Sequence, residues 1–142
     1  MNREDLREYK YTQQLIKDRI EYLQEYKERI SNISQILSDM PRGTRQINDS
    51  FAEKIAELTD SVDSLINKIH IETKKQKKIL EQIDRVEQPY RLILDKVYIQ
   101  GKSLVTVASD LQYDYKYICK QHGIALNKFD EINTTKEVET RL

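Results

Sequence analysis

The chain has 142 residues, enough for one or two compact units, and its 24 basic side chains are balanced by 24 acidic ones. With 3 Gly and 2 Pro it carries few helix breakers, which indicates long helices and argues against turn-rich β folds. One cysteine excludes an internal disulfide framework, and the sequence shows no apolar run of membrane-spanning length and no signal-peptide core, so we expect a cytoplasmic protein.

The first predicted element is a helix over residues 3–39. Apolar side chains recur along it with spacings of three and four, provided that the polar Gln13 and Lys27 are counted as members of the stripe. The apolar members are Leu6, Tyr9, Ile16, Ile20, Leu23 and Ile30. Beyond Ile30 the stripe shifts, which indicates a stutter in the heptad pattern. The Pro-Arg-Gly-Thr sequence at residues 41–44 then predicts the end of the helix and a reversal of the chain.

A second helix is predicted to begin near Asn48 or Asp49, since either residue is a suitable N-cap. Its apolar stripe is more regular and is interrupted at Glu72 and Gln76. The stripe consists of Phe51, Ile55, Leu58, Val62, Leu65, Ile69, Ile79, Ile83 and Val86. Two such stripes joined by a short turn predict a long antiparallel, coiled-coil-like helical hairpin over residues 1–88. A two-helix hairpin leaves apolar surface uncovered, so we expect it to pair with another copy as a homodimer or to fold back on the C-terminal domain.

After Pro89 the pattern changes to short helices, predicted over residues 90–99, 104–111 and 114–130. Ser103 and Asp114 are the candidate N-caps of the last two. Two helices of about eight and sixteen residues joined by a three- or four-residue turn have the form of a helix-turn-helix. The expected fold is therefore all-α, with a hairpin at residues 1–88, a helix-turn-helix domain at 89–132 and a flexible tail at 133–142.

The outward face of the last helix is the candidate binding surface. If Ile118, His122 and Ala125 are buried, then helical geometry points Lys116 and Lys120 away from the core. Lysine can donate to guanine edges or phosphates, and tyrosine can stack on or bond to the DNA backbone. Further candidates lie near helix ends, which can hold phosphates. The complete set of candidate DNA-binding residues is Arg91, Lys102, Ser103, Tyr115, Lys116, Tyr117 and Lys120.

Charge is unevenly distributed, and residues 90–129 carry a small basic excess. The six basic residues are Arg91, Lys96, Lys102, Lys116, Lys120 and Lys128, against the three acidic residues Asp95, Asp110 and Asp114. An excess of this size predicts moderate affinity for DNA, or binding as a dimer.

The stretch YRLILDKVYIQGKSLVTVASDLQYDYKYICKQHGIALNKFDEI, residues 90–132, resembles region four of bacterial sigma factors. It is more similar still to phage-encoded regulators of the late-gene-activator type. The matching residues are Leu94, Tyr98, Gly101, Ser103, Leu104, Val107, Ala108, Leu111, Gln112, Tyr113, Asp114, Ile118, His122, Gly123, Ala125 and Leu126. The resemblance implies a transcription regulator of phage or prophage origin in which Tyr115, Lys116 and Lys120 face the major groove.

The same residues also fit other hypotheses of function. The hairpin could instead be a protein-interaction module, with the C-terminal domain contacting RNA polymerase or another protein, or DNA binding could serve a packaging accessory role. The basic run at residues 74–78 is typical of a solvated helix face, and His122 of a helix-packing residue. Cys119 lacks the partners of a catalytic nucleophile. Since the sequence has no phosphate-binding glycine loop, nucleophile elbow or metal-ligand spacing, we expect no enzyme activity, cofactor or metal.

Overall fold

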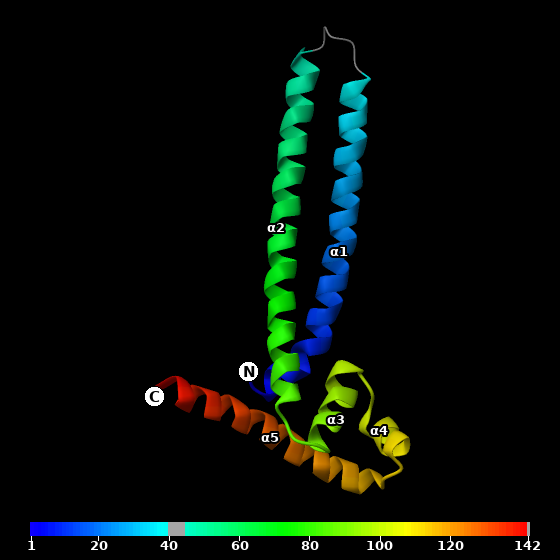
Figure 1. The fold of residues 1–142 in the computed structure, drawn as a ribbon. Coiled ribbons are helices and arrows are strands. Elements are labelled where there is room, and N and C mark those ends of the chain that lie inside the picture. Colours follow the sequence, from blue (N-terminus) through cyan, green and yellow to red (C-terminus); the bar gives the residue numbers. More distant parts are fainter. Residues whose placement is uncertain (40–44, 142) are drawn as a thin grey trace. The chain divides into compact units, whose positions relative to one another are not determined.

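The computed structural model describes the backbone of residues 1–39 and 45–141, and the side chains of residues 1–39 and 49–132. The described chain forms helices joined by turns and contains no strand, which confirms the predicted all-α class (Figure 1). The helices are α1 (Arg3–Ser38), α2 (Arg45–Asp84), α3 (Tyr90–Leu94), the π-helix η1 (Asp95–Ile99), α4 (Leu104–Leu111) and α5 (Tyr115–Arg141). The reversal predicted at residues 41–44 lies outside the described residues.

The chain divides into two compact units. One, here called the base unit, combines Met1–Gln13 with Lys74–Leu142, and the other, the distal hairpin, is Gln14–Thr73. This division differs from the one predicted at residues 88 and 132. The first turns of α1 and the last turns of α2 pack in the same unit as the C-terminal helices, because they share an apolar core with α5.

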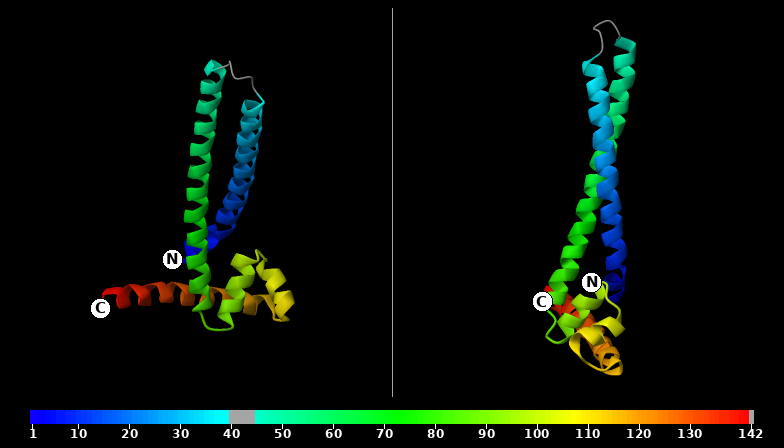
Figure 2. Two further views of the ribbon diagram at one scale, coloured as in Figure 1. Left: turned by 45° about the horizontal axis from the view of Figure 1, so that its top comes forward. Right: turned by 90° about the vertical axis from the view of Figure 1, so that its right-hand side faces the viewer.

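In the distal hairpin, α1 and α2 run antiparallel, side by side in both views of Figure 2. The half-buried side chains of α1 there include Ile16, Arg19, Leu23, Tyr26, Ile30, Ile33 and Leu37, spaced alternately by three and four residues. The predicted stripe was wrong at Ile20, which is 41% exposed, and at Gln13 and Lys27, which are exposed as well. The half-buried residues one position earlier, Thr12, Arg19 and Tyr26, take those places, so the stripe stays in phase beyond Ile30 and needs no stutter.

The stripe of α2 is confirmed, since its apolar members are buried or half-buried throughout. Both of its polar interruptions have partners on α1. Glu72 forms an ion pair with Arg19 inside the distal hairpin, where the two side chains are 18% and 23% exposed. In the base unit, Gln76 Nε2 donates to Gln13 Oε1 at 2.7 Å. A polar pair within an apolar seam, as Arg19–Glu72 is, penalises a shifted alignment of the two helices and so sets their register.

Two apolar clusters form the core of the base unit. The first, the hairpin-base cluster, consists of Leu6, Tyr9, Ile79, Ile83, Val86, Leu94, Ala125, Leu126 and Phe129. The second, the trihelical cluster, consists of Ile93, Val107, Ala108 and Ile118, with Val97, Leu104 and Leu111 packed against it. The buried Gln82 adds a polar tie, because its side-chain amide donates to the carbonyls of Phe129 at 3.0 Å and Met1 at 2.8 Å. The hairpin-base cluster joins the first turns of α1 and the last turns of α2 to α5, and the trihelical cluster holds α3, α4 and the start of α5 together.

Four helix boundaries differ from the predicted ones. α2 ends at Asp84, whereas the hairpin was predicted to continue to residue 88, so Val86 lies beyond the helix. α2 begins at Arg45, ahead of the predicted caps at Asn48 and Asp49. The helix predicted over residues 90–99 changes at Asp95 from α to π geometry. α5 continues to Arg141, whereas a flexible tail was predicted from residue 133. Polar composition does not by itself end a helix, and no Gly or Pro follows Gly123. No helix within the described ranges is long and apolar enough to cross a membrane.

Candidate nucleic-acid interface

α4 begins at the predicted cap, Ser103, and ends with a cap that was not predicted. The Ser103 hydroxyl oxygen accepts a hydrogen bond from the Thr106 amide at 3.2 Å, which satisfies one of the free amides of the first turn. At the other end Gln112 adopts φ 59°, and the Tyr113 amide donates to the Ala108 carbonyl at 3.0 Å. The Gln112 amide donates to Ser109 at 3.2 Å, which completes a Schellman motif. This motif turns the chain sharply into α5.

α5 opens directly after Asp114, whose carbonyl accepts from the Ile118 amide at 3.1 Å. The helix has two distinct faces in its first four turns. Its inner face is buried at Ile118, Ala125, Leu126 and Phe129, each at most 5% exposed. Its outer face carries the exposed side chains of Tyr115, Lys116, Tyr117 and Lys120. The predicted burial of Ile118 and Ala125 and the predicted exposure of Lys116 and Lys120 are confirmed, whereas His122, expected on the buried face, is half-buried.

The small side chain of Ala108 lets α4 and α5 approach closely. Ala108 is 5% exposed and belongs to the trihelical cluster with Val107 and Ile118. Ile93, on α3, closes the same cluster from the third side. The three packed helices and the tight turn therefore have the form of a helix-turn-helix in which α5 takes the place of the recognition helix.

Tyrosines surround the first turn of α5. The rings of Tyr113 and Tyr117 lie 5.1 Å apart, centroid to centroid, and are 55% and 45% exposed. Tyr115 is 49% exposed, and a hydrogen bond with the Cys119 side chain raises the pKa of its hydroxyl. The Tyr115 hydroxyl is therefore neutral at pH 7 and can donate to a phosphate or base acceptor.

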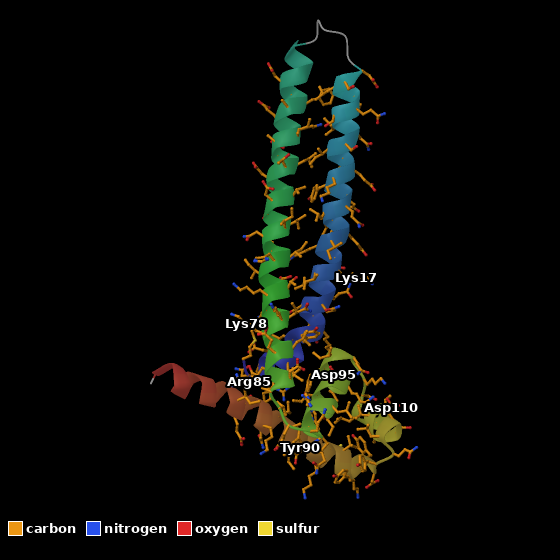
Figure 3. The ribbon with its side chains drawn as sticks, in the orientation of Figure 1. Lys17, Lys78, Arg85, Tyr90, Asp95 and Asp110 are labelled. Atoms are coloured by element: carbon orange, nitrogen blue, oxygen red, sulfur yellow. The ribbon has the colours of Figure 1, made fainter. Side chains whose placement is uncertain are left out.

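The remaining three predicted residues are engaged within the protein. Lys102 Nζ lies 2.8 Å from Asp110 Oδ2, and this bond holds the pKa of the Asp110 carboxyl below its ordinary value (Figure 3 shows Asp110). The Ser103 hydroxyl caps α4, and Arg91 Nη1 donates to the Asp84 carbonyl at 3.2 Å. Lys102 and Ser103 are neighbours at the start of α4, but Arg91 is tied to the end of α2. The structure therefore brings six of the seven candidates to the two helices of the helix-turn-helix.

One group of polar residues in the base unit could not be inferred from sequence spacing. Tyr98 Oη lies 2.7 Å from His122 Nε2, and the two rings stack with centroids 5.7 Å apart. Burial raises the pKa of Tyr98, and the charge of Arg7 opposes that shift. Burial lowers the pKa of His122, and the charges of Arg7 and Arg3 lower it further. Arg7, from the first turns of α1, therefore lies close to the helix-turn-helix, although no sequence motif links them.

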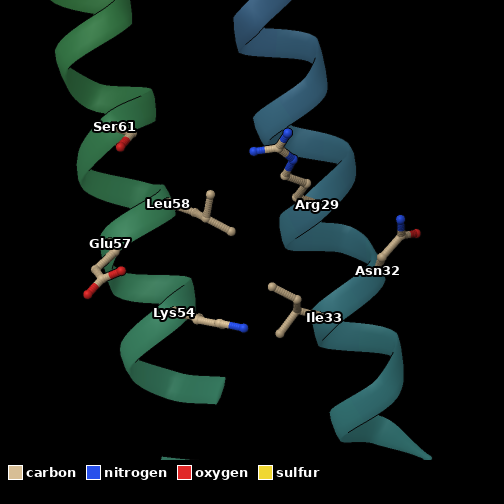
Figure 4. A pocket seen from close by; sticks show the side chains of 7 residues that line it. All are labelled: Arg29, Asn32, Ile33, Lys54, Glu57, Leu58 and Ser61. Carbon is tan, nitrogen blue, oxygen red and sulfur yellow. The ribbon is translucent and has the colours of Figure 1, made fainter. Parts of the chain in front are cut away.

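The distal hairpin has a groove of its own, of about 490 Å³, between α1 and α2 (Figure 4). Apolar and charged side chains alternate along it, among them Ile33, Leu58, Arg29 and Glu57. Its walls are solvated helix flanks with no concentration of one charge. Across the part of the chain with described side chains, no group of three or more His, Cys, Asp or Glu could hold a metal ion.

Comparisons with known proteins returned no similar one: no family model, no curated protein and no solved structure matches this chain.

Proposed function

We propose that the base unit binds double-stranded DNA, with the first turns of α5 in the major groove. The observation that carries the proposal is the two-faced α5. Ile118 and Ala125 are 1% and 0% exposed, while Lys116 and Lys120 on the opposite side are open to solvent. A helix that follows a tight turn and offers long cationic and phenolic side chains is suited to reading base edges and anchoring on phosphates.

The charge of this surface sets the expected strength of binding. Lys102 is paired with Asp110, so Lys116 and Lys120 supply most of the available positive charge on the α4–α5 face. Few phosphate contacts give modest affinity. Binding as a homodimer at a two-part site would raise it. The distal hairpin offers apolar side chains for such a dimer, such as Ile66 and Ile71, which are 47% and 57% exposed.

The resemblance of residues 90–132 to region four of sigma factors extends the proposal from DNA binding to transcription. On this view the chain is a phage or prophage regulator that acts in the cytoplasm at specific promoters. In this proposal the chain acts by binding alone and carries no enzyme activity.

DNA selection from a random duplex pool with the full-length protein, followed by fluorescence anisotropy on the selected duplex, tests the proposal. Lys116→Ala and Lys120→Ala should each weaken binding, by about 1–3 kcal/mol where the lysine reads a base. Lys17→Ala is the matched control, because Lys17 is exposed on α1 in the distal hairpin (Figure 3). If the three variants bind the duplex with equal affinity, α5 does not contact the DNA through Lys116 and Lys120.

A protein-binding role is the second candidate, and the exposed aromatic side chains favour it. Tyr113, Tyr115 and Tyr117 gather at the start of α5, and Val105 on α4 is 64% exposed. Exposed apolar surface of this kind also suits a protein partner such as RNA polymerase. Such a complex would be little affected by salt, and the protein would not retain DNA even at low ionic strength. A packaging accessory role would show itself as higher oligomers in light scattering.

A further inference from the structure

An open cavity of about 520 Å³ lies inside the base unit, between the first turns of α1 and the turn that precedes α4. Arg7 and Lys10 line it from α1, and Lys102 and Ser103 line it from the other side. The lining contains three cationic side chains and no carboxylate. Residues that are about 90 positions apart in sequence thus meet around one opening.

The cations of this cavity are only partly neutralised. Arg7 pairs with Glu4 at the surface, where the two side chains are 53% and 64% exposed, so water screens that pair and an incoming anion can replace it. Lys10 Nζ lies 5.0 Å from the centroid of the Tyr11 ring, a contact that leaves its charge uncompensated. Lys102 is held by Asp110, with side chains 35% exposed on both sides.

We propose that this cavity binds a backbone phosphate of DNA, with Arg7 and Lys10 as its principal ligands. The inference rests on the proposed function and extends the DNA interface from the helix-turn-helix to α1, where no candidate residue was expected. In a helix-turn-helix the helix before the recognition helix crosses the DNA backbone. The start of α4, at Lys102 and Ser103, forms one wall of the cavity, so a phosphate beside that helix lies within reach of α1.

The groups available match the chemistry of a phosphate. The Arg7 guanidinium can donate two parallel hydrogen bonds to phosphate oxygens, and Lys10 adds a second charge. Tyr98 also lines the cavity, and its hydroxyl is hydrogen-bonded to His122 Nε2 at 2.7 Å. Gly101, at φ +72°, has nothing within 4 Å of the position a Cβ would take, so the turn leaves the mouth open. Since these residues contact no base, the site should strengthen binding to every DNA sequence equally.

The test measures the salt dependence of binding for Arg7→Ala/Lys10→Ala in the full-length protein, on the selected duplex and on a scrambled duplex. Loss of one phosphate contact lowers the slope of log affinity against log salt by about 1, since each neutralised phosphate contributes about 0.9. Between 50 and 200 mM salt the affinity of the variant should therefore fall about 3.5-fold less than that of the wild type. The ratio of affinities for the two duplexes should not change.

Two further variants test whether the charge around Arg7, and not the stability of the fold, changes the affinity for DNA. Glu4→Gln removes the carboxylate that competes for Arg7 and should raise affinity, whereas Lys17→Ala on the same helix should have no effect. If the slope of log affinity against log salt is unchanged in Arg7→Ala/Lys10→Ala, while Lys116→Ala still weakens binding, the phosphate site is overturned and the proposed function stays intact. A change in sequence preference also overturns it, in favour of base contact. If the wild type binds no duplex at any salt concentration, both proposals fall.

Discussion

Removal of one member of the Arg19–Glu72 pair should destabilise the protein far more than removal of both. The two side chains are 23% and 18% exposed, and Glu72 Oε2 is buried without a hydrogen-bond partner. A fully buried charge that loses its partner costs about 3–5 kcal/mol. The remaining exposure of this pair lowers the figure to about 2–3 kcal/mol for Arg19→Leu. The double variant Arg19→Leu/Glu72→Leu should lie within about 1 kcal/mol of the wild type, or above it, because it replaces the pair by apolar packing.

Urea unfolding followed by circular dichroism, combined with thermal melts, measures this double-mutant cycle. At roughly 4 °C per kcal/mol for a chain of this size, Arg19→Leu should lower Tm by roughly 10 °C. Lys17→Leu is the control on the same helix, and as a change at an exposed position it should shift stability by less than about 0.5 kcal/mol. If the effects of Arg19→Leu and Glu72→Leu simply add, the two side chains act independently and do not set the register of α1 and α2.

Three further predictions concern the base unit. Gln112→Gly should raise the free energy of unfolding by about 0.5–1 kcal/mol in urea melts, because Gly adopts φ 59° without the strain that a side chain brings. Ser103→Ala should lower the free energy of unfolding by about 1 kcal/mol, because α4 loses its cap. If DNA affinity falls by more than the loss of folded protein explains, Ser103 also contacts a phosphate directly. The lowered pKa of His122 means that the unfolded chain gains a proton as pH falls through 6.5 while the folded chain resists it. Stability should therefore decline below that pH, with a slope reduced in His122→Gln and retained in the matched exposed variant His70→Gln.

Local signals in the sequence predicted the helix-turn-helix well. The bounds of α4 match the prediction because its start depends on the Ser103 cap, which lies within one turn of the helix. The two faces of α5 match because a 3.6-residue period places Ile118 and Phe129 on the side opposite Lys116, and burial follows that period. Both inferences need only residues that are close in the chain.

Features that depend on a distant partner were missed. Ile20 is more apolar than Arg19, so composition alone assigns it to the seam, yet Glu72 on the opposite helix selects Arg19. The basic cavity was missed for the same reason. Arg7 and Lys10 look like solvated charges until the base unit brings them to the turn before α4. Neither contact has a signature in the spacing of one helix.

The two apolar clusters explain why the first turns of α1 and the last turns of α2 form one unit with the helix-turn-helix. The first turns of α5 are held by the trihelical cluster at Ile118, but Ala125 and Phe129 are buried against Leu6 and Ile83 of the hairpin. Removal of residues 1–88 would expose Phe129, which is 0% exposed in the structure. The remaining chain would support α5 at its first turns alone. The orientation of a recognition helix fixes which of its side chains reach the bases. The first turns of α1 and the last turns of α2 are therefore part of the framework that holds α5 and positions Lys116 and Lys120.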